Sequence, residues 1–219
     1  MTTYKNASIN DLEQVAHLMA TGFLDYPFMT HSFFKRNFET QVEKQAFLAK
    51  MCFVYAKAML PNVTIFVSKN GEEFTGVAIF SKIEKMKISV LDLIRGGLIA
   101  FLPQLCKKHA FSFIKTFLRE GAVLDKKYMT TYAWYLHIFV TNPKHRGMQI
   151  GTKLMVEMLR FIKENQGESL VTSTNTEMAL KFYQKNGFEL MEQEQLTFHE
   201  VGKIDKFIIR RDLQEVATK

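Results

Sequence analysis

The sequence predicts an α+β protein with a mixed, mostly antiparallel central sheet flanked by helices. Two observations predict this class. β-branched and aromatic runs alternate with stretches of helical periodicity, and two of these runs are joined by a hairpin turn signal. The chain has 219 residues, of which 47% are hydrophobic and 23% are charged, a composition typical of a globular protein that buries a full core. We therefore expect a single domain over residues 1–219.

The first third of the chain is expected to mix strands and helices. The expected elements are, in order, a strand over 1–9, helices over 12–22 and 39–59, and strands over 64–68 and 74–83. Asn10 or Asp11 could cap the first helix, because short polar side chains accept hydrogen bonds from the first amides of a helix. Asn70-Gly71 is a strong hairpin signal, so the two strands that flank it should pair antiparallel.

A segment over about 87–127 is expected to be an inserted helical region in which apolar and basic residues occur together. Two interpretations stay open for it. It could be a helical lid packed on the sheet, or an amphipathic surface helix that touches a membrane. The chain contains no apolar span of ~20 residues, so stable membrane insertion is not expected.

The last part of the chain repeats the alternation of strands and helices. The expected elements are a strand over 132–141, a helix over 147–165, a strand over 169–173, a helix ending at 186–187, and strands over 188–197 and 204–210. The first of these strands is apolar on both faces, as a central strand should be. Thr174 and Glu177 have the spacing of a capping box, which should open the second helix.

Charge and cysteine content limit the classes of ligand and the cellular compartment that the sequence predicts. The formal net charge is +7, which fits either a lysine-rich solvated surface or attraction of a polyanionic ligand. The basic residues are scattered and form no recognised nucleic-acid motif, so we expect no nucleic acid as a partner. Cys52 and Cys106 form neither a disulfide framework nor a metal knuckle. Without a secretory signal, the sequence predicts a cytoplasmic protein with no metal site.

One segment carries the chemical information: YLHIFVTNPKHRGMQIGTKLM, a strand, a short turn and a helix. The amino terminus of a helix offers unpaired backbone N–H groups and a partial positive charge, and both favour phosphate oxygens. Gly147 and Gly151 would let a ligand approach the backbone, and Arg146 with His145 adds cationic side chains. These residues predict an anion site at the junction, although an ordinary turn between strand and helix has the same features.

The same segment resembles the coenzyme motif of the GNAT superfamily of acyl-CoA N-acyltransferases. That motif is R or Q, two residues, G, one residue, then G or A, after a strand that ends near a proline. Arg146, Gln149 and Gly151 hold the three marked positions. Gln149 replaces the first glycine of the motif, and it can be accommodated there if its backbone dihedrals are helical.

A second block, NTEMALKFYQKNGFEL, resembles the later motif of that family, N-x-x-A-x-x-x-Y-x-x-x-G-F. The residues that match in register are Ala179, Tyr183, Gly187 and Phe188. Thr176 holds the position of the asparagine, and Asn175 lies one residue earlier. Either side chain could reach the pantetheine arm of the coenzyme. The resemblance is strongest over residues 132–190.

The resemblance implies an enzyme that transfers an acetyl group from acetyl-CoA, as cosubstrate, to a primary amine by direct attack. Two strands, ending at Thr141 and near Ser173, would splay apart to admit the pantetheine arm. Backbone groups of Val140 and Thr141 would hold the coenzyme and orient the thioester carbonyl. The full set of expected coenzyme-binding residues is Phe139, Val140, Thr141, Arg146, Gly147, Met148, Gln149, Ile150, Gly151, Thr152, Asn175, Thr176 and Tyr183.

The catalytic residues implied by the resemblance are Tyr183 and His137. Tyr183 would protonate the departing thiolate, because a phenol with a pKa of ~10 keeps its proton at neutral pH; otherwise it is a core tyrosine. Tyr135 holds the position where some members of the family carry a glutamate base. Tyr135, His137 and Phe139 are expected to share one face of their strand, so His137 could accept the amine proton; water-mediated deprotonation is the alternative.

Two further readings of the sequence stay open. The protein could be a regulatory module that binds acyl-CoA without turnover, or a basic protein that binds nucleotides or nucleic acid. The insertion over 87–127, with the first two helices, is expected to shape the acceptor site. The expected partners are a coenzyme A thioester and an amine acceptor, with a homodimer as a possibility.

Overall fold

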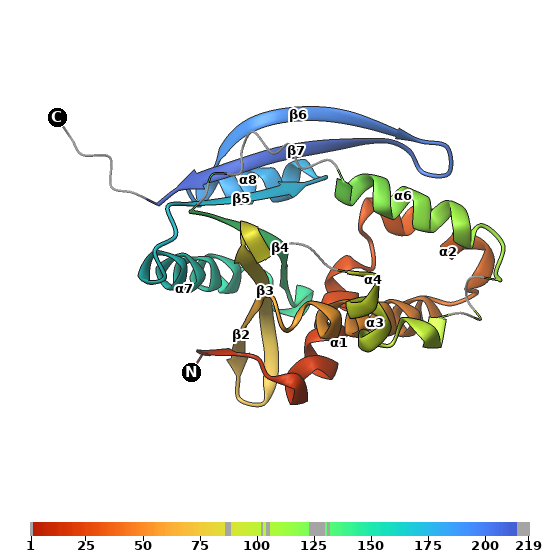
Figure 1. The fold of residues 1–219 in the computed structure, drawn as a ribbon, viewed down its shortest axis with the longest axis horizontal. Helices are drawn as coiled ribbons and strands as arrows, with labels where there is room; N and C mark the ends of the chain where they lie inside the picture. Colours follow the sequence, from red (N-terminus) through yellow and green to blue (C-terminus); the bar gives the residue numbers. More distant parts are fainter. Residues whose placement is uncertain are drawn as a thin grey trace.

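The computed structural model describes residues 2–85, 89–101, 103, 106–122, 130 and 132–213. Its centre is a seven-stranded sheet with the order β1-β2-β3-β4-β5-β7-β6 (Figure 1). The strands are β1 Thr2–Asn6, β2 Thr64–Asn70, β3 Glu73–Lys82, β4 Ala133–Thr141, β5 Ser169–Thr174, β6 Glu189–Phe198 and β7 Gly202–Asp212. β4 and β5 run parallel, and the other neighbouring pairs run antiparallel, which confirms the predicted mixed sheet.

Helices cover both faces of this sheet (Figure 1). The α-helices among the described residues are α1 Leu12–Phe23, α2 Ser32–Asn37, α3 Gln41–Met59, α4 Val90–Gly96, α6 Ala110–Ala122, α7 Ile150–Glu164 and α8 Glu177–Lys185. Short 3-10 turns lie at Ile9–Asp11, Pro27–Thr30, Ile83–Lys85, Leu98–Phe101 and Pro143–His145. α7 and α8 pack on one face, and α1 and α3 pack on the other.

The side chains of β3 show how the two faces are filled. Ala78 and Phe80 are buried against α7, where they contact a cluster that includes Leu154. Val77 and Ile79 alternate with them and are buried on the α1 side. Removing one such side chain from water contributes about 1.5–3 kcal/mol, so the alternation fixes the register of the central strands.

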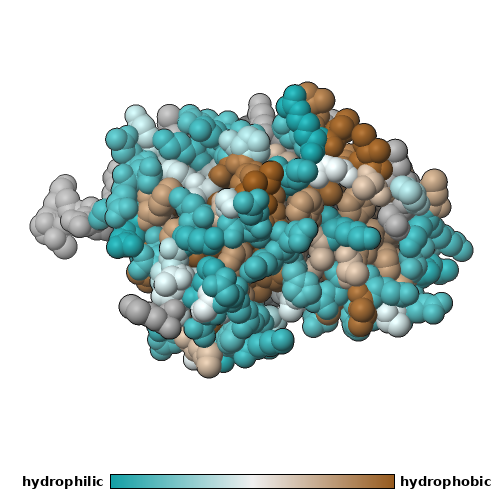
Figure 2. Space-filling model, turned by 90° about the horizontal axis from the view of Figure 1, so that it is seen from below, coloured by the Kyte–Doolittle hydropathy of each residue, from teal (hydrophilic) through white to brown (hydrophobic). Residues whose placement is uncertain are grey.

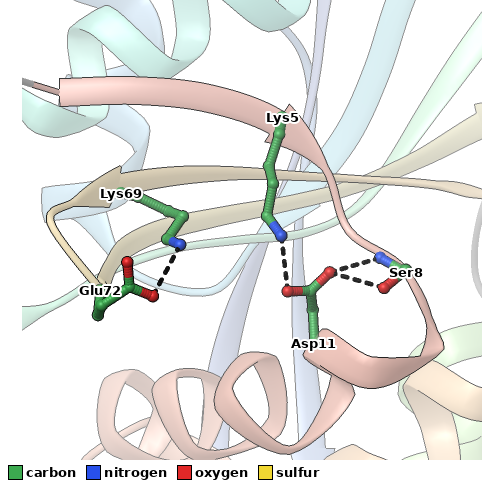
Figure 3. A network of polar contacts seen from close by, with 5 residues as sticks. All are labelled: Lys5, Ser8, Asp11, Lys69 and Glu72. Atoms are coloured by element: carbon green, nitrogen blue, oxygen red, sulfur yellow. Dashed lines mark hydrogen bonds and ion pairs between the residues drawn. The ribbon is translucent and has the colours of Figure 1, made fainter.

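A polar network fixes the entry into α1 (Figure 3). The carboxylate of Asp11 accepts hydrogen bonds from the backbone N–H of Ser8 (2.8 Å), from its hydroxyl (2.9 Å) and from Lys5 Nζ (2.7 Å). The bond from Lys5 is the largest of several effects that lower the pKa of Asp11 to about 2. Asp11 is the N-cap residue of α1, one of the two predicted candidates, but its side chain joins β1 to the preceding turn and does not bond to the first amides of α1.

The hairpin prediction is confirmed, since β2 and β3 pair across the turn at Gly71, whose φ is +61°. The described parts of the segment over 87–127 are mostly helical, as predicted, while 87–88, 102, 104–105 and 123–127 lie outside the described residues. α4 lies close on α3, because a methyl group added at Gly96 would come within 2.6 Å of the carbonyl oxygen of Val54. Phe113 of α6 stacks on Phe33 of α2 with ring centroids 5.2 Å apart.

Two helix starts differ from the predictions. α7 begins at Ile150 and not near Gly147, because Gly147 and Gln149 both have a positive φ, which a right-handed helix excludes. α8 is capped by Thr176, whose hydroxyl oxygen accepts a hydrogen bond from Ala179 N (3.2 Å). The predicted capping box of Thr174 and Glu177 is therefore wrong, because Glu177 is the first residue of the helix and not its third.

The surface seen from below is mostly hydrophilic, with hydrophobic residues gathered in a few places (Figure 2). One of these places lies at the upper right, at the end of the molecule that carries α3 and α4. Leu91, Ile94 and Ile99 are 53%, 41% and 60% exposed in α4 and the 3-10 turn after it. Among the described residues, none of the helices is both long and apolar enough to span a membrane.

Candidate active site

The central feature of the site is a gap between β4 and β5. The parallel ladder between these strands ends at Tyr135 and Val171. One residue further, the hydroxyl of Thr172 donates a hydrogen bond to the carbonyl oxygen of Leu136 (2.8 Å). Beyond that point β4 follows β3 as far as Thr141, and β5 follows β7 to its own end. The two strands therefore separate at their carboxyl ends, as the sequence predicted.

Backbone groups of alternate β4 residues face this gap. The backbone N–H of Asn142, directly after β4, donates to the carbonyl oxygen of Thr75 (2.8 Å). Antiparallel ladders alternate hydrogen-bonded and open pairs, so Val140 is hydrogen-bonded to β3. Phe139 and Thr141 then direct their N–H and C=O groups towards the gap. This orientation keeps both residues as candidate coenzyme ligands.

Val140 is not a candidate, and the prediction that its backbone holds the coenzyme is wrong. Its main chain serves the ladder to β3, and its side chain is 6% exposed. The side chain packs against Gly22 of α1, where an added methyl group would lie 2.4 Å from Cγ1 of Val140. Val140 therefore fixes α1 against the sheet.

A β-bulge interrupts β4 at His137. The register between β3 and β4 shifts between Ile79 and Phe80, whose partners are Ile138 and Leu136. His137 is thus the extra residue of the bulge, which lets β4 bend where it leaves β5. The sequence carries no Gly or Pro at this point to indicate a bulge.

The bulge also reverses which face the later residues of β4 occupy. Phe139 packs with Leu136 on the α7 side, and Ile138 packs on the α1 side. His137 lies beside Tyr135, with ring centroids 4.8 Å apart. The prediction that Tyr135, His137 and Phe139 share one face is therefore wrong for Phe139, because strict alternation fails at a bulge.

His137 lies in a desolvated place. Its Nε2 and the hydroxyl of Ser81 are 3.0 Å apart and share a hydrogen bond. Burial lowers the pKa of His137 to about 3. The imidazole is therefore neutral at physiological pH, and it holds an added proton weakly.

This pKa predicts how stability depends on pH. The folded-state pKa lies below the ordinary value of 6.5, so the unfolded chain binds the proton more tightly. The contribution of neutral His137 to the free energy of unfolding is fully present above pH 6.5 and is lost as the pH falls towards 3. Between pH 7 and pH 5 the wild-type protein should lose about 2 kcal/mol more of its free energy of unfolding than His137→Gln does, measured by urea unfolding at both pH values. Equal losses in both proteins would contradict the desolvated, neutral state of His137.

Tyr183 on α8 closes one side of the gap. It is 7% exposed, and its ring centroid lies 6.3 Å from that of Phe139 and 5.1 Å from that of Phe188. Burial raises the pKa of the Tyr183 phenol, and the nearby phenols of Tyr26 and Tyr135 raise this pKa further. Tyr183 is thus a core residue that also keeps its proton, so the two predicted roles do not exclude each other.

The two candidates for contact with the pantetheine arm differ in availability. The side-chain amide of Asn175 donates to the carbonyl oxygen of Asp205 (2.9 Å), and its oxygen accepts from the hydroxyl of Tyr26 (2.7 Å). Both ends of the amide are engaged within the protein. Thr176 accepts from the first turn of α8, which leaves its own hydroxyl proton able to donate. The geometry favours Thr176 of the pair.

The turn between β4 and α7 is the place where the sequence predicted an anion site. Gly147 has a φ of +83°, and a side chain there would meet open space. Arg146 and Met148 are exposed, and α7 begins at Ile150. The first amides of α7 have no acceptor within the helix, so they are available to an anion, whereas the amide of Met148 in the turn donates to the carbonyl oxygen of His145 (3.3 Å).

A carboxylate that the sequence analysis missed braces this turn. Glu73, at the start of β3, accepts a hydrogen bond from Nδ2 of Asn142 (2.9 Å). Its second oxygen lies 3.4 Å from Nε2 of His145. His145 is thereby directed towards β3, which leaves Arg146 as the cationic side chain of the motif that faces solvent. Nothing near Glu73 in the sequence distinguishes it from an ordinary surface acid.

Gln149 adopts a left-handed backbone conformation, with φ +57° and ψ +19°. The sequence analysis made helical dihedrals the condition for a residue other than glycine, and the helical region that Gln149 occupies is the left-handed one. The position favours glycine, because an L side chain in this region costs on the order of 1–2 kcal/mol. Gly151 also has a steric role, since an added methyl group would lie 3.2 Å from the ring of Phe182.

Gln149→Gly is therefore expected to raise the free energy of unfolding by about 0.5–1 kcal/mol, because relief of strain exceeds the entropy of the freer unfolded chain. Urea unfolding measures the change. Gln166→Gly is a matched control with a φ of +64°, and it should gain a similar amount. Gln184→Gly, within α8, should instead lose about 1 kcal/mol. A loss at Gln149 as large as at Gln184 would refute the strained conformation.

Comparison with known proteins agrees with this geometry. Residues 116–190 match the family model described as the Acetyltransferase (GNAT) domain. The match spans the turn before α7 and the α8 block, so it confirms the resemblance to the GNAT superfamily over this part of the chain. The comparison with curated protein sequences gives no match.

Solved structures of acetyltransferases share the fold at low sequence identity. The ribosomal-protein-S18-alanine N-acetyltransferase from Escherichia coli aligns with a TM-score of 0.56 at 10% identity, covering 100% of this chain and 98% of that chain. PaiA N-acetyltransferase from Thermoplasma acidophilum, in complex with coenzyme A, gives 0.54 at 10%, covering 97% and 99%. YncA from Salmonella typhimurium, with acetyl-CoA, gives 0.56 at 14%, covering 100% and 98%. The protein therefore has the fold of the GNAT acetyltransferases.

Proposed function

We propose that the protein is an N-acetyltransferase that transfers the acetyl group of acetyl-CoA to a primary amine by direct attack. The observation that carries this proposal is the gap between β4 and β5, which opens at the edge where α7 begins. Such a gap, next to the free amides of a helix amino terminus, suits an elongated ligand with a phosphate group part-way along it. The match to the GNAT domain supports the same ligand.

The chain offers separate partners for the two parts of the coenzyme. The amides from Gly147 to Thr152, with Arg146, would bind the diphosphate. The backbone groups of Phe139 and Thr141 and the hydroxyl of Thr176 would bind the pantetheine arm. PaiA and YncA are structures with coenzyme A and acetyl-CoA, which supports binding of this coenzyme to the shared fold.

When bound, acetyl-CoA supplies an activated acetyl group as a thioester. Tyr183 donates its phenolic proton to the departing sulfur as the amine nitrogen bonds to the acetyl carbon and the carbon–sulfur bond breaks. Burial keeps this proton on the phenol at neutral pH. Tyr183 regains a proton from solvent, which balances the proton that the amine loses.

The proton of the amine leaves through water in this proposal. His137 is a weak acceptor because its pKa is about 3, and Tyr135 holds the strand position where the family can carry a glutamate. The hydroxyl of Ser81 and the ring of His137 could order such a water without taking a full charge. His137 is then a positioning residue.

Two measurements test the proposed function. Acetyl-CoA should raise the melting temperature, whereas ATP and a short oligonucleotide at equal concentration should not. A panel of primary amines should then release free thiol from acetyl-CoA. Stabilisation without thiol release for any amine would favour a regulatory module that binds acyl-CoA without turnover, and stabilisation by the oligonucleotide alone would refute the proposal.

A further inference from the structure

The loop between α1 and the 3-10 turn Pro27–Thr30 reaches across to the end of β5. Tyr26 in this loop donates its phenolic proton to the side-chain oxygen of Asn175 (2.7 Å), directly after β5. Asn175 is itself held by the carbonyl oxygen of Asp205 in β7 (2.9 Å). The ring of Tyr26 is thus held by the backbone of its own loop and, through its hydroxyl, by Asn175 at the end of β5.

Tyr26 lies beside the groups that the proposed chemistry uses. Its phenol is close enough to Tyr183 to raise the pKa of that residue, and Tyr135 acts on Tyr183 in the same way. Phenols from the first loop and from β4 thus both act on Tyr183 of α8, and the hydrogen bond to Asn175 places Tyr26 at the end of β5. Tyr26 is the one among these three that comes from outside the matched segment.

Aromatic rings continue from Tyr26 to the β6–β7 hairpin. Phe23 lies edge-on to Tyr26 with centroids 5.4 Å apart, and Phe28 follows at 6.2 Å. Phe198 of the β6–β7 hairpin then meets Phe28 at 5.4 Å. Phe23 and Tyr26 keep part of their rings exposed, while Phe28 and Phe198 are each 4% exposed behind them.

This run of four rings forms an apolar wall supported from behind by a small core cluster, which also includes Leu196 and Ile204. A rigid apolar wall gains free energy when it covers an apolar ligand surface. The four rings carry no charge to pair with a second ammonium group, and covering such a group would cost its hydration.

We infer that Tyr26 determines acceptor specificity: its ring, fixed by Asn175 at the strand gap, selects primary amines that carry an aromatic or aliphatic body. This inference rests on the proposed acetyl transfer. It adds to that function the class of acceptor and a residue outside the coenzyme motif. Tyr26 contacts the body of the acceptor, and the hydrogen bond to Asn175 holds the ring in place.

Kinetics with two probe amines test the inference: 2-phenylethylamine and 1,4-diaminobutane. The wild-type protein should prefer 2-phenylethylamine in kcat/KM by about 50-fold or more, on the order of 2.3 kcal/mol of differential binding. Tyr26→Ala should reduce this preference at least fivefold. Tyr26→Phe keeps the ring but loses its anchor, so it should raise KM for the amine several-fold and keep the preference.

Asn175→Ala should reproduce the effect of Tyr26→Phe. In the double variant, KM for the amine should be no higher than in the more impaired of the two single variants, because the two changes break one hydrogen bond. The matched control is Tyr132→Phe, which removes a phenol that is 58% exposed. In all variants the Kd of acetyl-CoA by calorimetry should stay within twofold of the wild type.

Three outcomes would overturn the inference: a preference for 1,4-diaminobutane, an unchanged preference in Tyr26→Ala, or a tenfold weaker Kd of acetyl-CoA in Tyr26→Phe. If acetyl-CoA binds and neither amine is acetylated, the acceptor class is wrong. Failure of the wild-type protein to bind acetyl-CoA is a different result, because it removes the proposed function itself.

Discussion

Tyr183→Phe is expected to lower kcat about a hundredfold while KM for acetyl-CoA stays nearly constant. The variant keeps the ring that packs between Phe139 and Phe188, so the fold and the gap should persist. It removes the only atom that can give a proton to the departing sulfur from this side chain. General acid catalysis contributes about 10²–10⁴-fold, which sets the expected size. Thiol release at saturating amine measures kcat.

The pH profile distinguishes a proton donor from a structural tyrosine. Because burial and two neighbouring phenols raise the pKa of Tyr183, the wild-type rate should show no alkaline decline at the ordinary tyrosine value of 10.0. Tyr132→Phe should leave kcat unchanged. A Tyr183→Phe variant with normal kcat and a raised melting temperature would assign the residue to the core alone.

Arg146→Glu is expected to weaken acetyl-CoA binding about thirtyfold, or roughly 2 kcal/mol. The change replaces an exposed cation beside the expected diphosphate with an anion. The fold should tolerate it, because an acidic side chain near a helix amino terminus interacts favourably with the helix dipole. Calorimetry at low and moderate salt measures the change, which should shrink as salt screens the charges.

The control for this variant is Arg160→Glu, which reverses a charge inside α7, away from its amino terminus. The side chain of Arg160 is 68% exposed and pairs with Glu157. Its reversal should change the Kd of acetyl-CoA less than twofold. Equal effects of both reversals would mean that net charge, and not a local site, attracts the coenzyme.

Much of the fold follows from local patterns in the sequence. The hairpin at Asn70-Gly71 and the central strand before Asn142 were predicted because turn residues and β-branched runs act over a few positions. α2 and the 3-10 turn before it were not predicted, since one or two turns of helix have little periodicity. The sequence also predicted helices over 87–127, and the described parts of this segment contain α4 and α6.

The details that shape the site depend on contacts between distant parts of the chain. The bulge at His137 is set by how β3 pairs with β4, and it moves Phe139 to the other face. The left-handed Gln149 is imposed by a tight turn that glycine would suit better. Tyr26 and Asn175 meet across 149 residues. Periodicity and spacing report none of these contacts, because each arises only when the sheet is assembled.

The central claim is that main-chain amides from Gly147 to Thr152 bind the diphosphate of coenzyme A. Two-dimensional NMR of the ¹⁵N-labelled protein, titrated with coenzyme A, tests it at individual amides. The account predicts saturable shifts that are largest for Gly147 and Gly151, with little change for Gly71 in the distant hairpin. If these two amides stayed in place at millimolar coenzyme A, or moved no more than Gly71, the claim would be contradicted.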